Sequence, residues 1–162
     1  MPNAHRFALA ALLLLGSAVL AGLVVTLSTP RYAGARVPPA RELPWPTSVA
    51  AADRTPPFVL LYVSSSCGHC SRAAVLVDSL LTARRIRGAI VTNDTPDRAA
   101  SYCEKLRLTR PLAYDSGSVL IHAIGTHAVP TLVLFHADGS RQLLVGFAHD
   151  EPFRRAIEAL EQ

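Results

Sequence analysis

Apolar residues occur along the chain in runs of two kinds, and from residue 58 onward these runs alternate. The uninterrupted apolar run 58–63 is typical of a buried β-strand. Apolar residues at helical spacing follow between residues 73 and 81, and they predict an amphipathic helix that continues to about Arg85 and is ended by Gly88. The short apolar run 89–91 predicts a second buried strand.

The alternation continues less regularly in the next part of the chain. A second helix is predicted to begin at Asp94 or Thr95, with Pro96 in its first turn. One face of this helix would carry Ala99, Tyr102, Cys103 and Leu106. Residues 109–129 show no clear period and include a turn-like stretch at 115–118.

A hairpin and a helix are predicted at the end of the chain. The apolar runs 131–135 and 143–145 flank the turn sequence 138–139 and therefore predict a β-hairpin. Asp150 is expected to cap a final helix that has Pro152 in its first turn. The inward face of this helix would carry Phe153, Ile157 and Leu160. The whole order predicts an α/β fold with a mixed central sheet flanked by helices.

An apolar segment precedes this region at residues 7–27, where 21 consecutive residues carry no charged side chain. At about 1.5 Å per residue, a helix of this length spans roughly 31 Å, enough to cross the hydrocarbon core of a bilayer. A cleaved signal peptide is the alternative, but the run is long for one and no small-residue cleavage motif follows it. The pattern therefore predicts one N-terminal transmembrane helix, with residues 1–6 as a cytoplasmic tail.

Prolines are concentrated directly after the predicted transmembrane helix. Residues 28–57 contain seven of the twelve prolines of the chain, which disfavours regular helix and favours extended backbone. We therefore expect residues 28–55 to form a spacer and residues 56–162 to form the folded domain. Trp45 is expected either to dock on the domain or to lie at the bilayer surface.

The charge distribution argues against a nucleic-acid-binding function. The formal net charge is +4, but the arginines are scattered and no run of basic residues is interleaved with aromatic residues. The partner that the sequence predicts for residues 7–27 is a lipid bilayer.

The motif Cys67-Gly68-His69-Cys70 stands between the first predicted strand and the first predicted helix. Two thiols at this spacing can close a small disulfide or provide half of a metal site. At the start of a helix, the first sulfur lies at the positive end of the helix dipole, which lowers the thiol pKa and favours a thiolate. This setting favours redox chemistry over a structural disulfide or a metal site.

Three further side chains could take part in metal or redox chemistry. His122 and His127 are five residues apart, a spacing that could complete a zinc site with the two cysteines. His127 also precedes Pro130 by three residues and is expected near the dithiol. Cys103 lies on the apolar face of its predicted helix, so we expect a buried, inert thiol rather than a redox partner. No metal site is predicted.

A strand that leads into this CxxC motif, followed by Val129-Pro130-Thr131 at the start of a later strand, resembles the thioredoxin superfamily. More narrowly, the layout of the anchor and of residues 56–162 is similar to that of the membrane-anchored TlpA/ResA type of thiol-disulfide oxidoreductase. This resemblance implies a thioredoxin-like fold with a cis peptide bond at Pro130, which would lie against the dithiol. The backbone of Val129 would pair with a substrate strand. The resemblance implies no cofactor other than the redox-active Cys67–Cys70 disulfide.

The same resemblance implies roles for the residues of the motif. Cys67, exposed at the helix start, would be the attacking thiolate, and the more buried Cys70 would resolve the mixed disulfide. Gly68 and His69 would support them, since a histidine at this position in protein disulfide isomerases stabilises the thiolate.

Two positions depart from the pattern of the relatives. Ser66 stands where relatives usually carry tryptophan, so the rim that faces the substrate is expected to be less aromatic. Leu61 stands where thioredoxin-like proteins often bury an acid beneath the dithiol, so the sequence shows no dedicated proton acceptor for Cys70.

These observations predict thiol-disulfide exchange on proteins outside the cytoplasm. The expected activity is a disulfide reductase, with apocytochrome c as one client, that exchanges electrons with an upstream membrane donor or acceptor. The expected location is a bacterial inner membrane, crossed once, with the C-terminal domain facing the periplasm. The alternatives are a disulfide oxidase or isomerase with the same residues, a Sco-like copper chaperone that uses Cys67, Cys70 and His127, and a non-catalytic assembly factor.

Overall fold

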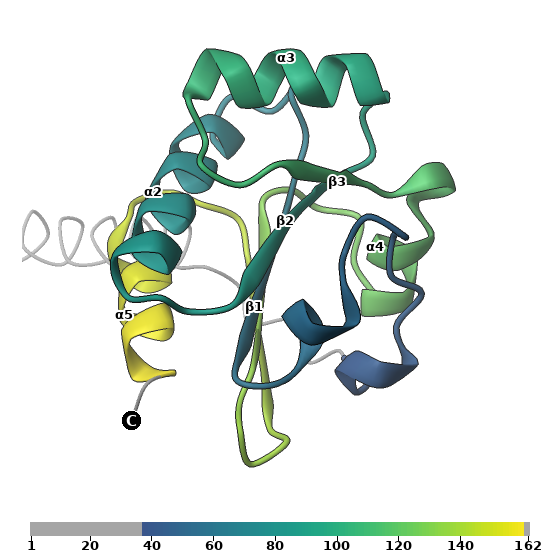
Figure 1. The fold of residues 1–162 in the computed structure, drawn as a ribbon. Coiled ribbons are helices and arrows are strands. Elements are labelled where there is room, and N and C mark those ends of the chain that lie inside the picture. The colour runs from purple at the N-terminus through teal and green to yellow at the C-terminus, as the bar shows by residue number, and fades with distance from the viewer. Residues whose placement is uncertain (1–36, 161–162) are drawn as a thin grey trace, which may run out of the picture.

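The computed structural model describes residues 37–160, and a five-stranded mixed sheet lies at the centre of this part of the chain (Figure 1). The strands are β1 (Phe58–Val63), β2 (Gly88–Thr92), β3 (Leu112–Tyr114), β4 (Thr131–Phe135) and β5 (Arg141–Val145). Their order in the sheet is β3-β2-β1-β4-β5. The pairs β1–β2 and β2–β3 are parallel, whereas β4 is antiparallel to both β1 and β5. The predicted mixed sheet is confirmed.

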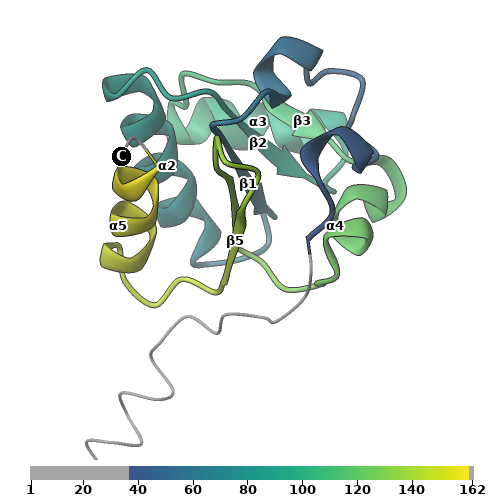
Figure 2. The ribbon, with the colours of Figure 1, turned by 90° about the horizontal axis from the view of Figure 1, so that it is seen from below.

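Helices cover both faces of the sheet. They are α2 (Cys70–Ala83), α3 (Pro96–Leu106), α4 (Val119–Ile124) and α5 (Glu151–Ala159), with short 3₁₀ turns η1 (Ala40–Glu42), η2 (Ala51–Arg54) and η3 (Ser116–Ser118). Helices α2 and α5 lie side by side on one face, and α4 and η1 lie beyond the other (Figures 1 and 2). The result is a three-layer arrangement in which the sheet separates two hydrophobic clusters.

Strand β1 lies in the middle of the sheet and is buried on both sides. Its odd-numbered residues join the cluster beneath α2 and α5, while its even-numbered residues join the cluster on the α4 side. All six of its residues are almost completely buried. A strand buried on both faces has no polar side to show, which explains the uninterrupted apolar run in the sequence.

The end of helix α2 differs from the prediction. The helix ends at Ala83, not near Arg85, because Arg85 adopts a left-handed conformation with φ 57° and the Ile86 N–H turns back to the Leu81 carbonyl. Gly88 does not end the helix but begins β2. A Cβ atom at Gly88 would lie 2.6 Å from the Leu81 side chain, so the glycine is needed where the strand passes close under the helix.

The stretch 109–129 contains more regular structure than the sequence predicts. It includes the edge strand β3, which is three residues long, and the short helix α4. The predicted hairpin is confirmed, and its second strand begins two residues earlier than expected, at Arg141. The final helix also forms, but Asp150 makes no side-chain capping hydrogen bond; its carboxylate pairs with Arg72 at 2.7 Å instead.

A buried polar pair connects β1 to the loop before α4. The Tyr62 hydroxyl donates a hydrogen bond to the Asp115 carboxylate at 2.8 Å, and that carboxylate also accepts the backbone N–H groups of Leu120 and Ile121. Burial, together with the hydrogen bond to Asp115, raises the pKa of Tyr62 far above its ordinary value. The tyrosine therefore remains a neutral donor, and the carboxylate fixes the start of α4.

The described part of the predicted spacer packs against the sheet rather than extending from it. Val37, Ala40, Leu43 and Val49 are buried in the cluster on the α4 side. Trp45 docks on the domain, because its ring lies 5.3 Å from the Phe58 ring and its indole N–H donates to the Ala40 carbonyl at 2.6 Å. The predicted tail at residues 1–6 and the predicted transmembrane helix at residues 7–27 lie outside the described residues. Within residues 37–160, no helix has the length and apolar character needed to span a membrane.

Candidate active site

Cys67 and Cys70 are joined by a disulfide between the end of β1 and the start of α2, with their Cα atoms 5.3 Å apart. Cys70 is the first residue of α2 and is completely buried, whereas Cys67 is only partly buried. The intervening Gly68 and His69 are exposed. A partner molecule can therefore reach the Cys67 sulfur, and the Cys70 sulfur is shielded behind it.

The first turn of α2 gives this end of the helix a positive electrostatic potential. His69 occupies the position just before the helix and forms no side-chain capping bond, and the first turn contains no acidic residue. Unpaired backbone N–H groups at a helix N-terminus carry a partial positive charge that stabilises nearby anions. This arrangement lowers the free energy of a thiolate at Cys67 once the disulfide is opened.

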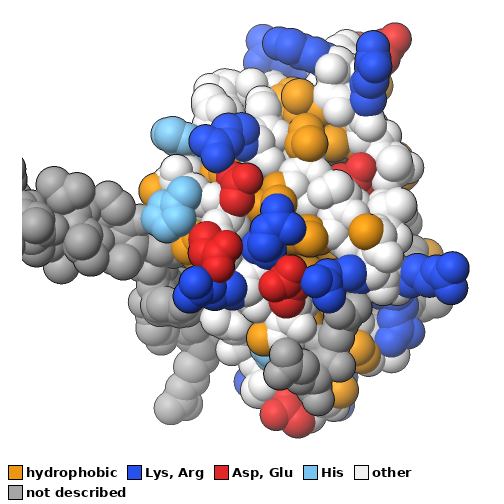
Figure 3. Space-filling view, turned by 90° about the vertical axis from the view of Figure 1, so that its left-hand side faces the viewer, with side chains coloured by type: hydrophobic (Ala, Val, Ile, Leu, Met, Phe, Trp, Pro, Cys, Tyr) orange, Lys and Arg blue, Asp and Glu red, His pale blue; other side chains and the backbone are white. Residues whose placement is uncertain are grey.

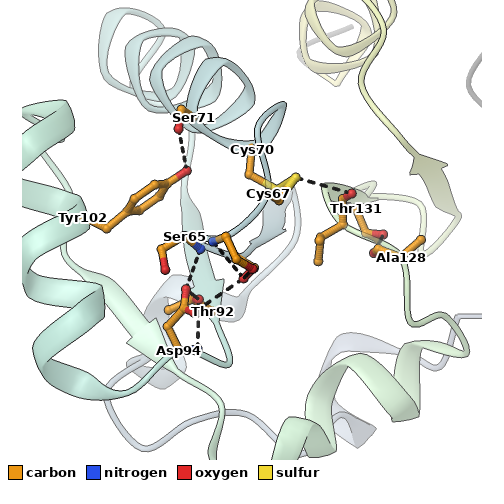
Figure 4. The surroundings of a disulfide bond; sticks show 12 residues. Ser65, Cys67, Cys70, Ser71, Thr92, Asp94, Tyr102, Ala128 and Thr131 are labelled. Carbon is orange, nitrogen blue, oxygen red and sulfur yellow. Dashed lines mark hydrogen bonds between the residues drawn. A yellow bond between two sulfur atoms is a disulfide. The ribbon is translucent and has the colours of Figure 1, made fainter.

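A loop that ends in a cis proline lies beside the dithiol (Figure 4). The Val129–Pro130 peptide bond is cis, and the Val129 carbonyl oxygen is 3.7 Å from the Cys67 sulfur. The Thr131 hydroxyl donates to the Ala128 carbonyl at 2.7 Å, which holds the loop against the start of β4. The structure thus brings Val129 and Pro130 to the place that the resemblance implies, and their roles with a substrate stay predictions.

Asp94 fixes the loop that precedes the CxxC motif (Figure 4). Its carboxylate accepts the backbone N–H of Ser65 at 2.6 Å and the hydroxyl of Thr92 at 2.8 Å. Burial alone would raise the pKa of Asp94, but the hydrogen bonds from Ser65 and Thr92 together with the positive charge of Arg98 outweigh it and hold the pKa below its ordinary value. Because Asp94 follows β2 and β1 is its parallel neighbour, both loops leave the sheet at the same edge. The sequence pattern places Asp94 only at the start of a helix.

We expect the charge of Asp94 to stabilise the protein in a pH-dependent way. A carboxyl group whose pKa is lowered by folding contributes stability above its unfolded pKa, and the contribution is lost as the pH falls through the folded value. Asp94→Asn should therefore lower the free energy of unfolding by about 1 kcal/mol at pH 7. The difference should shrink below about pH 4. Urea unfolding of both proteins between pH 3 and 7 measures it, and a difference that stays constant down to pH 3 would show that the charge has no part in it.

The buried side of the dithiol is apolar. Leu61, where the resemblance to thioredoxin-like proteins led us to look for an acid, is fully buried in the same cluster as Cys70. Among the described residues the buried carboxylates are Asp78 and Asp115, and both are engaged elsewhere. Asp78 accepts hydrogen bonds from Thr109 and forms an ion pair with Arg110, both in the loop between α3 and β3. Asp115 accepts the hydrogen bond of the buried Tyr62 hydroxyl.

The first turn of α2 is also tied to the neighbouring helices. The Ser71 and Tyr102 hydroxyls are 3.2 Å apart and connect α2 to α3, as Figure 4 shows. The Arg72 guanidinium contacts Asp150 at the start of α5 and lies 5.7 Å from the centre of the Phe147 ring. On this side of the molecule, cationic and acidic side chains alternate around exposed apolar patches (Figure 3). The contacts of Ser71 and Arg72 hold the start of α2 in place beside the cis-proline loop.

Cys103, His122 and His127 are the remaining side chains with possible redox or metal chemistry. Cys103 is half-buried, not fully buried as expected, and its thiol faces the Arg110 carbonyl at 3.4 Å. The imidazole rings of His122 and His127 contact each other in a T-shaped arrangement with centres 4.7 Å apart. Within residues 37–160, no three His, Cys, Asp or Glu side chains are close enough together to hold a metal ion. The structure therefore does not gather Cys67, Cys70 and His127 into one cluster.

The fold resembles those of known redox proteins. No protein-family model matches the chain, and no curated protein matches it. A thiol:disulfide interchange protein DsbE from Chlorobium tepidum has a similar structure, with a TM-score of 0.59 and 17% identity over 82% of this chain and 96% of that chain. A secreted disulfide oxidoreductase from Mycobacterium tuberculosis gives a TM-score of 0.56 with 17% identity over 64% of this chain and 81% of its own. Peroxidoxin BcpB from the same organism gives 0.52 with 18% identity over 64% and 77%. At these identities the likeness shows a thioredoxin-like fold.

Proposed function

We propose that this protein catalyses thiol-disulfide exchange on protein substrates through Cys67 and Cys70. The observation that carries the proposal is the setting of the disulfide: a reachable Cys67 sulfur at a helix N-terminus, 3.7 Å from the carbonyl that precedes cis Pro130. The solved structures with the same fold include a thiol:disulfide interchange protein and a disulfide oxidoreductase, which supports this chemistry. Protein substrates with cysteine thiols or disulfides are the partners that such a site fits.

The reaction proceeds in two exchange steps. In the reducing direction, the Cys67 thiolate attacks one sulfur of a substrate disulfide, forms a mixed disulfide and releases the other substrate sulfur as a thiolate. The Cys70 thiolate then attacks the Cys67 sulfur, which releases the second substrate thiol and closes the Cys67–Cys70 disulfide. Two electrons pass to the substrate, and a dithiol of an upstream partner must return them. The structure holds the oxidised state that ends this cycle.

The substrate backbone has a docking place beside the sulfurs. Val129 is partly exposed, and its carbonyl is directed toward Cys67 from a loop that Thr131 and Gly146 hold by hydrogen bonds. An extended peptide that pairs with the Val129 backbone would place its own cysteine next to Cys67. Pro130 has no N–H group and cannot compete for the sulfur.

We favour a disulfide reductase as the physiological direction, with apocytochrome c as one client class. The support is the TlpA/ResA-like layout of the sequence together with the name DsbE that a structural neighbour carries. An oxidase or isomerase is the second candidate. It is supported by His69 and by the absence of an acid in the first turn of α2, since both stabilise a thiolate and thereby the reduced form.

The equilibrium potential of the dithiol distinguishes these two directions. For a reductase we expect a value near that of thioredoxin, about −270 mV, when the protein is equilibrated with glutathione buffers. A value near about −120 mV, as for the strong oxidant DsbA, would contradict the reductase assignment. His69→Ala should shift the potential by about 30 mV in the reducing direction, because the thiolate loses a stabilising neighbour. His136→Ala, at the other end of the sheet, serves as the matched control.

The proposed location is the extracytoplasmic side of a bacterial inner membrane, with residues 7–27 as the anchor. The support is the uncharged apolar segment in the sequence and the redox compartment in which such disulfide chemistry is useful. Carbonate extraction of membranes and protease treatment of spheroplasts test this placement. Release of the chain from the membranes by carbonate would contradict the placement. So would protection of the domain from protease in intact spheroplasts, if lysis of the spheroplasts removes that protection.

A further inference from the structure

We infer that a pocket at the opposite end of β1 from the dithiol binds an organic anion that has an apolar portion. The pocket has a volume of about 550 Å³, within the usual range for small-molecule sites. One wall comes from the 3₁₀ turns η1 and η2 of the proline-rich segment, and the other comes from the β4–β5 hairpin. The register of β1 with β4 pairs Phe58 with Phe135, which lines the pocket, while the cysteines follow the other end of β1.

The charge of the lining favours an anion. Arg41, Arg54, Arg141 and His136 line the pocket, and no acidic side chain does among residues 37–51 and 54–160, whose side chains the structure describes. Neither Arg54 nor Arg141 forms an ion pair with a described carboxylate. Two acids nearby are already engaged: Glu42 pairs with Arg41 at 3.6 Å on the exposed surface, and the Asp138 carboxylate accepts the Ser140 N–H in the hairpin turn. The guanidinium groups of Arg54 and Arg141 are therefore available for a carboxylate or phosphate, which they bind bidentately.

Part of the remaining lining is apolar, which favours a ligand with an apolar portion over a simple inorganic ion. Pro39, Ala40, Pro56 and Phe135 contribute to it. The Arg54 guanidinium lies 5.9 Å from the centre of the Trp45 ring, which helps to hold it at the pocket. An anion that carries a short apolar part satisfies both kinds of lining, because its charged group meets the arginines and its apolar part covers the hydrophobic wall.

The position of the pocket has a structural consequence. Its two walls come from segments more than 75 residues apart in the sequence, so a bound ligand would join the proline-rich segment to the hairpin. A ligand that binds only the folded arrangement stabilises it. The site is separate from the redox-active residues and does not depend on the proposed exchange reaction.

Trp45 provides a direct readout for a binding experiment. It is the one tryptophan of the chain, and its ring lies 6.3 Å from that of Phe135 in the pocket wall. We would titrate the full-length chain in neutral detergent with dihexanoyl phosphatidylglycerol and with hexyl phosphate and follow the tryptophan fluorescence. Dihexanoyl phosphatidylcholine serves as the ligand without net charge, and inorganic phosphate serves as competitor. Tighter binding of the phosphatidylglycerol would indicate a lipid headgroup as the natural ligand, and tighter binding of hexyl phosphate would indicate a free organic phosphate.

The proposal predicts a saturable fluorescence change with at least one of the two organic anions. Arg141→Gln should weaken that binding at least about tenfold, because it removes a charge-assisted contact. Arg41→Gln provides a second test on the other wall. Arg155→Gln, which removes the same charge from an exposed position on α5, should leave the affinity unchanged.

Four outcomes would overturn the proposal. They are the absence of a saturable change, equal affinity for the phosphatidylcholine, equal affinity of the arginine variants and the parent, and competition by inorganic phosphate at the concentration of the organic ligand. The last would show that the apolar wall contributes nothing.

Discussion

Replacing Cys70 with alanine is expected to convert the protein into a covalent trap for its substrates. Cys67 stays partly exposed at the start of α2 and can still attack a substrate disulfide, but no second thiol is present to release the product. An intramolecular thiol reacts at a very high effective concentration, so we expect turnover to fall by a factor of at least about 10³. The mixed disulfides should appear on non-reducing gels of the host membrane fraction and can be identified by mass spectrometry.

Two further variants make this experiment decisive. Cys67→Ser together with Cys70→Ala should yield no adduct, because the attacking sulfur is gone. Cys103→Ala in the Cys70→Ala background should leave the adducts unchanged, since the Cys103 thiol is turned toward backbone carbonyls of the loop that follows α3. Adducts that depend on Cys103 instead of Cys67 would contradict the assignment of Cys67 as the nucleophile.

The largest loss of stability is expected from Asp115→Ala. This change removes the acceptor of the buried Tyr62 hydroxyl and of the backbone N–H groups that begin α4. Each buried donor left without an acceptor costs about 1–3 kcal/mol, so we expect the free energy of unfolding to fall by about 3 kcal/mol or more. Urea unfolding followed by circular dichroism measures the change.

Tyr62→Phe separates the contributions of the two partners. This variant removes the hydroxyl and leaves the contacts of Asp115 with the start of α4, so it should cost clearly less, about 1 kcal/mol. The effects of the two substitutions should not add in the double variant, because they share one interaction. Equal losses for the two single variants would show that the backbone contacts of Asp115 contribute little.

The predictable parts of the fold are those with a strong local pattern. Strand β1 was predicted at its observed bounds, because a strand buried on both faces is apolar throughout. The start of α3 at Pro96 and the inward face of α5 followed from helical spacing and from the preference of proline for the first turn. The dithiol followed from the CxxC motif together with its place between a strand and a helix, which favours redox chemistry over a metal site.

The parts that the sequence did not predict depend on tertiary contacts. Strand β3 has three residues and forms because β2 pairs with it, so its own sequence carries little signal. The left-handed Arg85 and the close approach at Gly88 depend on how α2 crosses the sheet. Asp94 acts on a loop 29 residues away in the sequence, and only the parallel pairing of β1 with β2 brings the two together. A polar residue directly after a strand that neighbours the CxxC strand is the signal that would have found it.

With residues 7–27 as the proposed membrane anchor, the docking of residues 37–49 on the sheet would limit the distance between the dithiol and the bilayer. An undocked spacer over residues 28–55 would allow the domain to lie up to about 95 Å from the membrane at full extension. Because Val37 is already buried, at most residues 28–36 would separate the proposed anchor at residues 7–27 from the folded body, and nine residues extend at most about 30 Å. The distance of the dithiol from the membrane would then depend mainly on the dimensions of the domain itself. Clients would have to come to the membrane surface, and lengthening the segment before Val37 would be the way to extend that distance.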